Sequence, residues 1–279
     1  MNIPYEDESL RVIFKKEGNN PEYENKMRTC SIVVTVKNEA PNIASLYNNL
    51  HDLVENNNQS QKKLAFPFVK EIIIVDGGST DGTIDILGGL ADRIRSFTLI
   101  VIKQPLNTKL AYAEYCGAMT ASGDYIVKMD GDGQHDVSTA IDMLKNASNY
   151  DIVIASRHIE DGGSKWKPIR GVISRAAKAE FHALFPRLWH VKDPLSGFFL
   201  CKRDALPKIP PNKNGFKYLL HILALKPGLR VLEVPFIIQE RSFGQSKIAA
   251  SARSMVLNYN RELIYCYRLH RKALRKYSE

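Results

Sequence analysis

The chain has 279 residues, 44% of them hydrophobic, and a formal net charge of +9 at neutral pH. A chain of this length and composition can bury a complete core, as one large domain or two small ones. Its positive charge indicates an anionic partner, such as a nucleic acid, a membrane surface or a phosphorylated substrate. The first residues lack the basic start and apolar core of a signal peptide. Since no stretch of about 18 residues is apolar enough to cross a bilayer, we expect no transmembrane segment.

The four cysteines are scattered along the chain and include no CxxC pair: Cys30, Cys116, Cys201 and Cys266. This spacing indicates neither a disulfide framework nor a zinc site. Reduced structural thiols in a cytoplasmic protein are the simplest interpretation.

Residues 1–27 are polar and charged, and a turn-forming cluster runs from Gly18 to Pro21. This composition predicts a loosely held N-terminal arm.

Beyond this arm, short runs rich in Val and Ile alternate with helical patterns. The runs are largely continuous rather than alternating in polarity, as in strands that are buried on both faces. They cover residues 31–36, 71–75, 98–102, 125–129 and 151–155, and the helical patterns lie near residues 42–56, 82–95, 108–121 and 137–147. This order predicts an α/β fold in which a mostly parallel central sheet is flanked by helices.

The pattern becomes less regular after residue 156. We expect a helix over residues 169–189, strands over 197–201 and 229–238, and a long helix from residue 247. No internal repeat or low-complexity linker divides the chain, so a single domain over residues 28–250 is expected, followed by a basic C-terminal helix over 251–279.

Polar loops follow three of the predicted strands and begin near Asn38, Asp76 and Asp130. In open α/β sheets, ligands bind at the carboxyl ends of the strands. We therefore expect these loops to meet at one edge of the sheet and to form the site.

Asp130 and Asp132 flank a glycine directly after an apolar strand. Two carboxylates in such a turn can converge on one ion, and hard oxygen ligands suit Mg²⁺ or Mn²⁺, which then bridge to phosphate oxygens. Gln134 and His135 could add a ligand or orient one. The alternative interpretation is an ordinary Asp-rich turn.

Asp76 directly follows the second strand, where a carboxylate can accept hydrogen bonds from a ribose or a nucleobase. Alternatively, Asp76 or Ser79 caps the next helix, although Asp81 fits that structural role better. No GxGxxG or GxxxxGK[ST] pattern is present, so the classical dinucleotide and P-loop sites lack their signatures.

Basic residues recur in the second half of the chain. Arg157 follows a strand, Arg170 and Ser174 are four residues apart on one helix face, and Arg241 and Lys247 flank a glycine loop. Any one of them is most simply a solvated charge, but together they are consistent with a clamp for phosphate oxygens.

In combination, these motifs resemble the non-processive branch of glycosyltransferase family 2, and most of all the dolichol-phosphate mannose synthases and related polyprenyl-phosphate glycosyltransferases. The resemblance spans about residues 30–250 and rests on Asn38-Glu39, the segment 75–83, the segment 129–135, Ser156-Arg157, Arg170 with Ser174, the segment 193–199 and the segment 241–247. It implies a GT-A-type, Rossmann-like domain that acts on a nucleotide-diphosphate sugar.

The resemblance also implies roles for individual residues. Asn38, Glu39, Asp76 and Asp130 would bind the donor nucleotide. Asp130, Asp132 and Gln134 would hold Mn²⁺ or Mg²⁺ on its diphosphate. Arg157, Arg170 and Ser174 would receive the acceptor phosphate of a polyprenyl or dolichyl lipid, and Arg241 and Lys247 would act near the phosphates.

Two departures from the family pattern affect the nucleotide side. The first motif usually reads proline-x-tyrosine-Asn-Glu, whereas Thr35, Val36 and Lys37 precede Asn38 here. The second usually has paired aspartates, and Gly77 stands in place of the second. Donor identity, GDP-mannose or UDP-glucose type, therefore stays open.

The expected reaction is direct, inverting displacement by a lipid phosphate. Because a monophosphate is mostly dianionic at neutral pH, it requires positioning and charge screening more than a base. One alternative is a family 2 enzyme with a sugar or other hydroxyl acceptor and Asp193 as its base. Another is a catalytically silent module that binds nucleotide sugars.

The tail over residues 247–279 holds eight Lys or Arg residues against two Glu residues, with aromatic and aliphatic residues between them. Such a helix can lie on anionic headgroups as a peripheral element of the cytoplasmic face, or dock on a membrane-anchoring subunit. It can equally pack on the core through its apolar stripe. No recognition motif supports binding to nucleic acid.

Overall fold

The computed structural model describes residues 11–18, 28–60, 67–164, 168–226, 228–239 and 252–276. Of residues 56–60, 164, 168–173, 252–255 and 273–276 only the backbone is described.

Strands and helices alternate through the first two thirds of the chain. The strands are β1 (Arg11–Glu17), β2 (Thr29–Val36), β3 (Phe68–Asp76), β4 (Thr98–Lys103), β5 (Tyr125–Asp130), β6 (Ile152–Ser156), β7 (Gly163–Ser164), β8 (Phe199–Lys202), β9 (Val231–Pro235) and β10 (Ile237–Ile238). The α-helices are α1 (Ala40–Ser60), α2 (Thr83–Ala91), α3 (Leu110–Thr120), α4 (Val137–Asn146), α5 (Pro168–Leu184), α6 (Tyr218–Leu225) and α7 (Ala252–Lys276), and two short 3₁₀ helices are η1 (Pro186–Leu188) and η2 (Arg203–Ala205).

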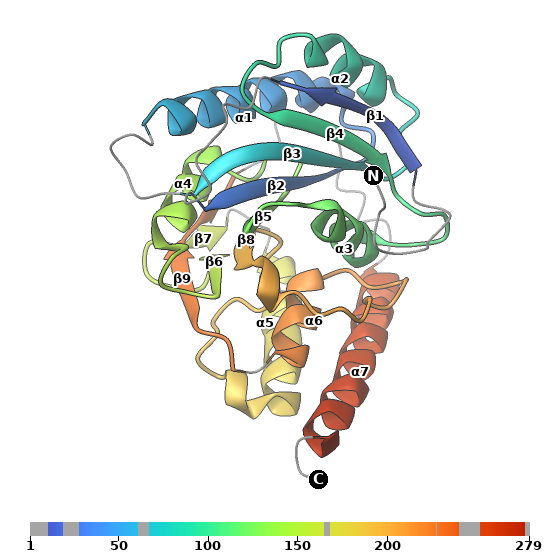
Figure 1. The fold of residues 1–279 in the computed structure, drawn as a ribbon. Helices are drawn as coiled ribbons and strands as arrows, with labels where there is room; N and C mark the ends of the chain where they lie inside the picture. Colours follow the sequence, from blue (N-terminus) through green and yellow to red (C-terminus); the bar gives the residue numbers. More distant parts are fainter. Residues whose placement is uncertain are drawn as a thin grey trace.

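Eight of these strands form one mixed, mostly parallel sheet with the order β1-β4-β3-β2-β5-β8-β6-β9 (Figure 1). Strands β4, β3, β2 and β5 are parallel neighbours, and β6 is parallel to β9. Strand β8 runs antiparallel between β5 and β6, and β1 runs antiparallel along β4. The predicted α/β fold is confirmed, and the carboxyl ends of β2, β3 and β5 share one edge.

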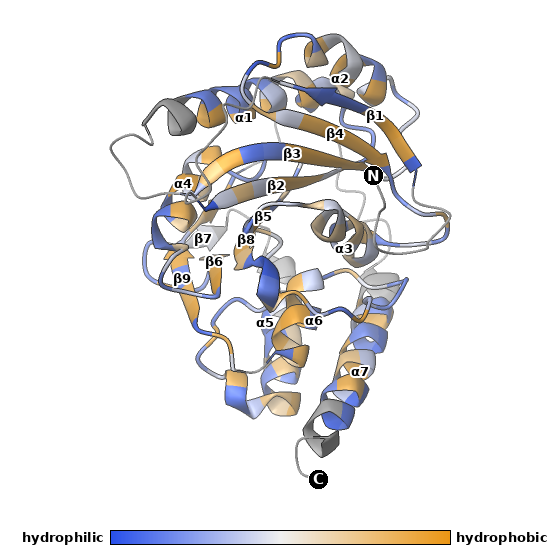
Figure 2. Cartoon of the chain, in the orientation of Figure 1, coloured by the Kyte–Doolittle hydropathy of each residue, from blue (hydrophilic) through white to orange (hydrophobic). Residues whose placement is uncertain are grey.

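Helices cover both faces of the sheet, which explains why its central strands are mostly apolar. Val33 of β2 packs in the core shared with α3, α6 and α7, whereas Val34 faces the opposite core with α1, α2 and α4. The hydropathy colouring in Figure 2 shows the hydrophobic strands enclosed between the helices. Burial on both faces removes the alternation of polarity that marks a half-exposed strand.

The N-terminal region differs from the expected loose arm. Residues 11–17, which the sequence places within a polar arm over 1–27, form β1 at the sheet edge. Most β1 side chains are exposed, so polarity there marks an edge strand with one solvated side rather than an absence of structure. Residues 1–10 and 19–27 lie outside the described parts.

The helix expected over residues 169–189 is shorter than predicted. Helix α5 ends at Leu184, and Pro186 begins η1 two residues later. Proline has no N–H to continue the hydrogen-bond ladder and clashes with the preceding turn, so the chain starts a new helix there. The predicted strand over residues 229–238 is likewise divided into β9 and β10 after Pro235.

Helix α7 packs on the domain beside α5 and α6 (Figure 1). Its buried residues Tyr259, Glu262, Leu263 and Cys266 recur with helical spacing and face the core. The predicted tail helix is therefore present from Ala252, while residues 240–251 lie outside the described parts. Within the described segments, no helix is both long and apolar enough to cross a bilayer.

Candidate active site

Three loops meet at the carboxyl edge of β2, β3 and β5. The backbone N–H of Gly77 donates to Val36 O at 2.8 Å, and that of Gly131 donates to Thr35 O at 2.9 Å. The loops after β3 and β5 are thus bonded to the end of β2 from its two sides. The residues around Asn38, Asp76 and Asp130 come together as the strand order predicts.

Asn38 and Glu39 are held against the loop after β3. Asn38 adopts a positive φ of 50°, its N–H donates to Ser79 Oγ at 2.8 Å, and its Oδ1 accepts from the Thr80 N–H at 2.8 Å. Glu39 is buried, and its Oε2 accepts from Asn42 Nδ2 at 2.8 Å. These contacts place both expected donor-binding residues in one rigid corner of the edge.

Asp76 is buried and organises its own loop. Its carboxylate accepts hydrogen bonds from the N–H groups of Gly78 and Ser79, at 3.0 and 3.1 Å, and from Ser79 Oγ at 2.5 Å. Asp81 instead accepts from the N–H groups of Ala40 and Thr83, at 2.9 and 3.1 Å, which begin α1 and α2. Asp81 is therefore the structural residue of the pair, as its sequence position suggested.

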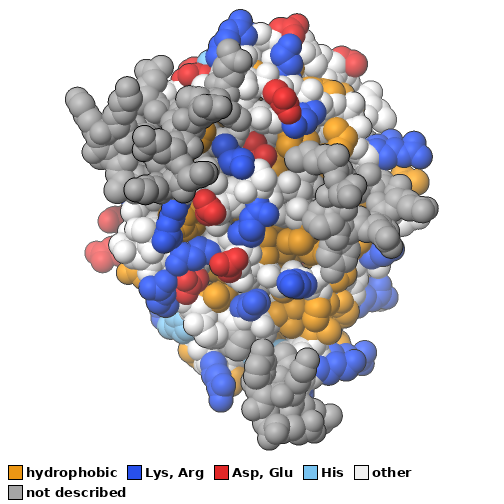
Figure 3. Space-filling model, in the orientation of Figure 1, with side chains coloured by type: hydrophobic (Ala, Val, Ile, Leu, Met, Phe, Trp, Pro, Cys, Tyr) orange, Lys and Arg blue, Asp and Glu red, His pale blue; other side chains and the backbone are white. Residues whose placement is uncertain are grey.

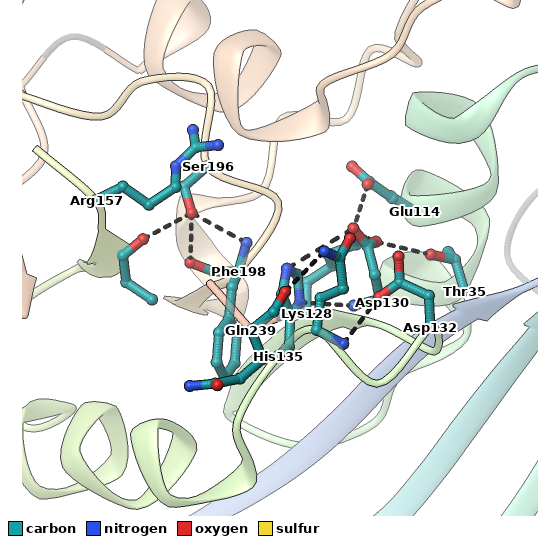
Figure 4. A network of polar contacts seen from close by, with 12 residues as sticks. Thr35, Glu114, Lys128, Asp130, Asp132, His135, Arg157, Ser196, Phe198 and Gln239 are labelled. Atoms are coloured by element: carbon teal, nitrogen blue, oxygen red, sulfur yellow. Dashed lines mark hydrogen bonds and ion pairs between the residues drawn. The ribbon is translucent and has the colours of Figure 1, made fainter. Parts of the chain in front are cut away.

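Asp130 is the centre of a partly buried network of charges (Figure 4). Its Oδ1 accepts from Lys128 Nζ and, at 3.2 Å, from Thr35 Oγ1. Lys128 is almost fully buried, and its Nζ also lies 2.6 Å from Glu114 Oε1. Burial lowers the pKa of Lys128, but the charges of Asp130 and Glu114 outweigh it and hold the pKa above its usual value.

Lys128 and a second lysine, Lys217, keep Asp130 ionised. Burial raises the pKa of Asp130, yet the nearby charges of Lys128 and Lys217 outweigh this effect and hold it well below its usual range. Asp132 is buried on the same loop, and its Oδ1 accepts from the Gln134 N–H at 3.1 Å. The loop after β5 thus presents carboxylate oxygens at the edge where the three loops meet.

His135 orients Asp130 as a neutral side chain. Its Nδ1 accepts from the backbone N–H of Asp130 at 2.9 Å, which leaves the ring proton on Nε2, 3.8 Å from Asp130 Oδ2. The imidazole stacks on Phe198 with ring centroids 4.8 Å apart and meets Phe236 edge-on. Burial lowers the pKa of His135 to about 3.

A second cation, Lys217, lies close to Asp130 beside Gly197. A Cβ added at Gly197 would lie 3.1 Å from Asp130 Oδ2 and 3.2 Å from Lys217 Nζ, so both groups border the same point. Burial lowers the pKa of Lys217, and the charges of Asp130 and Glu114 only partly offset this effect. A side chain at position 197 would therefore crowd the carboxylate and the ammonium group.

The described residues fit Mg²⁺ or Mn²⁺ only as a site completed by other ligands. Among the described parts of the chain, no group of three or more His, Cys, Asp or Glu side chains is arranged to hold a metal ion. Asp130 and Asp132 offer hard oxygens, and Mg²⁺ is commonly held by one or two carboxylates together with substrate phosphates and water. This donor set suits an ion that arrives with a diphosphate.

Gln134 connects the acidic loop to β10. Its Nε2 donates to Gln239 O at 2.8 Å, and the Gln239 N–H donates to Gln134 O at 3.2 Å. Gln239 is the last described residue before the segment that carries Arg241 and Lys247, and both of these predicted site residues lie outside the described parts. The described chain thus stops at Gln239, which is bonded to the acidic loop.

Arg157 and Asp193 form a buried bidentate ion pair. Arg157 Nε and Nη2 donate to the two carboxylate oxygens of Asp193, each at 2.7 Å, and the Arg157 N–H donates at 3.0 Å. Burial raises the pKa of Asp193, but hydrogen bonds and charge from Arg157 outweigh it, so the pKa is lowered. A carboxylate held in this way is a poor general base.

Arg170 and Ser174 both belong to α5, as the helical spacing predicted. The Arg170 side chain lies outside the described parts, and Ser174 is partly exposed. The structure therefore brings together the residues of the acidic edge. Of the predicted phosphate clamp it describes the side chains of Arg157 and Ser174 and only the backbone of Arg170.

Three charged residues of the site were missed in the sequence: Glu114, Lys128 and Lys217. Lys128 interrupts an otherwise apolar strand two residues before Asp130, and Glu114 interrupts the otherwise apolar helix α3. A charge within a fully buried element is costly unless it is paired, so these interruptions were the available signal. Lys217 precedes α6 in a loop and carries no comparable signal.

The fold and the site together define a mixed α/β domain whose acidic loop follows a central strand of the sheet. A family model described as glycosyl transferase family 2 matches residues 31–209, well over half of the chain. The chain belongs to glycosyl transferase family 2.

Two relatives illustrate its place in the family. The chain is 31% identical over 222 residues to a dolichol-phosphate mannosyltransferase of Pyrococcus furiosus, in a match that covers 78% of this chain and 58% of that protein. It is 29% identical over 203 residues to a dolichol-phosphate mannosyltransferase of Saccharomyces cerevisiae, with 69% and 74% covered. The chain thus spans less than two thirds of the length of the Pyrococcus protein.

Solved structures support the fold. Glucosyl-3-phosphoglycerate synthase of Mycobacterium tuberculosis, in complex with Mn²⁺, UDP-glucose and glycerol 3-phosphate, superposes with a TM-score of 0.57. The match is 20% identical and covers 86% of this chain and 78% of that one. At this identity the likeness concerns the fold alone.

Proposed function

We propose that the chain transfers a hexose from a nucleotide-diphosphate sugar to a polyprenyl or dolichyl phosphate, with inversion at the anomeric carbon. The observation that carries this proposal is the carboxylate of Asp130, which contacts Lys128, lies next to Lys217 and is followed by Asp132 at the end of β5. The two relatives named above, both dolichol-phosphate mannosyltransferases, support a lipid phosphate as the acceptor.

On this proposal the acidic loop binds the diphosphate end of the donor. Asp130 and Asp132, with Gln134 beside them, would hold Mn²⁺ or Mg²⁺, which supplies Lewis-acid neutralisation of the charge that develops on the departing diphosphate. Asn38, Glu39 and Asp76 would bind the nucleoside, since their loops border the acidic loop. Lys217 lies where it would add a positive charge next to the same oxygens.

The acceptor side favours a phosphate over a hydroxyl group. A hydroxyl acceptor needs a base, and Asp193, the candidate for that role, has both oxygens engaged by Arg157. A phosphate dianion needs none and requires positioning by cations, which Arg157, Arg170 and Ser174 would provide from β6 and α5, with Arg241 and Lys247 near the phosphates.

The two departures from the family pattern lie against each other on the nucleotide side. A Cβ at Gly77 would lie 3.2 Å from Lys37 Cβ and 3.3 Å from Lys37 Cδ. A lysine thus packs over the position from which the usual second carboxylate is missing. We propose that Lys37 adds a cationic contact to the donor nucleotide, and that it contributes to the choice between GDP-mannose and UDP-glucose.

The test is a donor panel with a short polyprenyl phosphate and either Mn²⁺ or Mg²⁺, followed by analysis of the product. We expect a glycosyl phospholipid whose anomeric configuration is opposite to that of the donor. Retention of configuration would remove the single displacement. Turnover with a sugar hydroxyl but not with a lipid phosphate would favour the alternative acceptor, and donor binding without turnover on any acceptor would indicate a binding module.

A membrane surface is the second proposed partner. The outer face of α7, defined by Leu257, Arg261, Ile264 and Arg268, has the spacing of one helix face and is exposed. Figure 3 shows Lys and Arg side chains in the lower part of this view, with a few Asp and Glu side chains among them. Arginine alternating with large apolar residues suits anionic headgroups.

A further inference from the structure

A buried glutamate of α7 holds the loop that carries Lys217. Glu262 is 1% exposed, and its Oε2 accepts from the N–H groups of Phe216 and Lys217, at 2.7 and 3.2 Å. The next N–H, that of Tyr218, donates to Glu114 Oε2 at 3.1 Å. Two buried carboxylates, from α7 and α3, thus bind three consecutive N–H groups at the start of α6.

These N–H groups would otherwise be unsatisfied. Helix α6 has no side-chain cap from its own N-cap residue, Lys217, and the first N–H groups of a helix lack partners within it. Buried N–H groups without an acceptor are costly, so Glu262 and Glu114 together determine where this turn lies.

The loop fits Glu262 closely. A Cβ added at Gly215 would lie 2.6 Å from Glu262 Oε1 and 2.9 Å from its Cδ. The Gly215 carbonyl oxygen also accepts from the Ala111 N–H at 3.0 Å, at the start of α3. The segment 215–217 is therefore fixed between α3 and α7 with no room for displacement toward Glu262.

Lys217 points from this fixed segment to the acidic loop. Its Nζ and Asp130 Oδ2 both border Gly197, as the Cβ contacts at that glycine show. A continuous path thus leads from Glu262 through the backbone of residue 217 to Asp130. Helix α7 contributes to this path although it lies outside residues 31–209, the range that the family model matches.

We propose that Glu262 is a positioning residue that holds the Lys217 ammonium group at Asp130, and that Lys217 contacts the donor diphosphate during transfer. The proposal deepens the glycosyl transfer proposed above and rests on it for the role of Lys217. Loss of Glu262 frees the 216–217 backbone, moves the ammonium group and lowers turnover through Lys217 alone.

The first test measures the position of Lys217 without any substrate. Acetylation of lysines by an N-hydroxysuccinimide ester is followed by mass spectrometry in the wild type, Glu262→Leu, Glu262→Gln and Cys266→Ala. Glutamine keeps an oxygen acceptor for the two N–H groups. Cys266 is the matched control, because it is equally buried one turn further along α7 and its Sγ lies 3.7 Å from His221 Nδ1, whereas Glu262 accepts from the N–H groups of Phe216 and Lys217. We expect Lys217 to be labelled about tenfold faster in Glu262→Leu only, and equal rates in all four proteins would overturn the positioning role.

The second test measures turnover. We expect Glu262→Leu to lower kcat by about 100-fold, as a displacement of about 1 Å can, with the acceptor KM unchanged and with most activity restored in Glu262→Gln. Lys217→Met should lower kcat to a similar degree, and Glu262→Leu with Lys217→Met should be no worse than Lys217→Met alone. Independent, multiplying losses would contradict the proposal, as would equal losses in Glu262→Leu and Cys266→Ala. If the wild type transfers no sugar at all, the proposed function fails while the labelling result still decides the role of Glu262.

Discussion

At the scale of single residues, the two aspartates of the acidic loop have different surroundings. Asp130 neutralises the buried Lys128, whereas Asp132 accepts a hydrogen bond from the backbone of Gln134. Removing the charge at position 130 leaves a buried ammonium group with Glu114 as its remaining carboxylate. Asp130 therefore serves both stability and the proposed chemistry.

Asp130→Asn should destabilise the protein by about 2 kcal/mol, because a buried charge loses one of its partners. Asp132→Asn should change stability by less than about 1 kcal/mol, since the amide oxygen still accepts from Gln134. Urea unfolding of both variants measures the difference. Both should lose roughly 100-fold or more in turnover, so equal stability with unequal activity would contradict this assignment.

Asp193→Asn is a poor test for a catalytic base in this protein. The substitution breaks the bidentate pair with the buried Arg157 side chain and should cost about 3 kcal/mol in the free energy of unfolding. The pH dependence of kcat is therefore measured at a temperature at which the variant is folded. We expect kcat to show no new dependence on pH, and loss of the acidic limb of the pH profile, where a general base becomes protonated, would instead support Asp193 as the base.

At the scale of elements, Glu262 links α7 to the loop that carries Lys217, and its carboxyl group is titratable. Burial raises the pKa of Glu262 to about 8, although hydrogen bonds from the N–H groups of Phe216 and Lys217 oppose the shift. The folded protein thus binds this proton more tightly than the unfolded chain, in which the group titrates near 4.5.

Stability should consequently fall as pH rises between 4.5 and about 8. Within this window the unfolded chain has released the proton and the folded protein has kept it, so the group contributes a loss of roughly 1.4 kcal/mol per pH unit. Glu262→Gln removes this contribution. The free energies of unfolding of the wild type and of Glu262→Gln are measured by urea unfolding at several pH values. The difference between them should change with pH, and a constant difference would be inconsistent with the raised pKa.

At the scale of the whole molecule, the exposed face of α7 lies opposite the face that packs on the core. Tyr259, Leu263 and Cys266 are buried, while Leu257 and Ile264 are about half exposed. The two interpretations of the tail helix are thus compatible, because one stripe packs on the domain and the other is available to an anionic surface.

The double variant Arg261→Glu with Arg268→Glu should weaken flotation with vesicles that contain anionic lipid, because each basic residue near such a surface contributes about 1 kcal/mol to binding. Salt at about 0.5 M should weaken flotation of the wild type in the same way, because it screens these charges. Lys103→Glu with Lys145→Glu is the matched control, because it changes net charge equally at exposed positions on β4 and α4. Equal loss of binding in both double variants would indicate an effect of net charge rather than of α7.

The order of elements from β2 to β6, the parallel core of the sheet and the meeting of three loops at one edge follow from the sequence alone, whereas β1 and α6 were not predicted. These features depend on local patterns: apolar runs buried on both faces, helical periodicity between them, and polar loops at strand ends. The carboxylates of Asp76 and Asp130 were recognisable for the same reason, because each directly follows an apolar run.

Only the tertiary structure decided which charges act on those carboxylates. These charged residues come from four separate elements: Glu114 from α3, Lys128 from β5, Lys217 from the loop before α6, and Glu262 from α7. No local pattern specifies the distances between them. The pairing of Arg157 with Asp193 likewise joins residues 36 positions apart and engages both oxygens of the candidate base. Electrostatic interactions depend on separation in space and on burial, and both are set by the packing of elements that are distant in sequence.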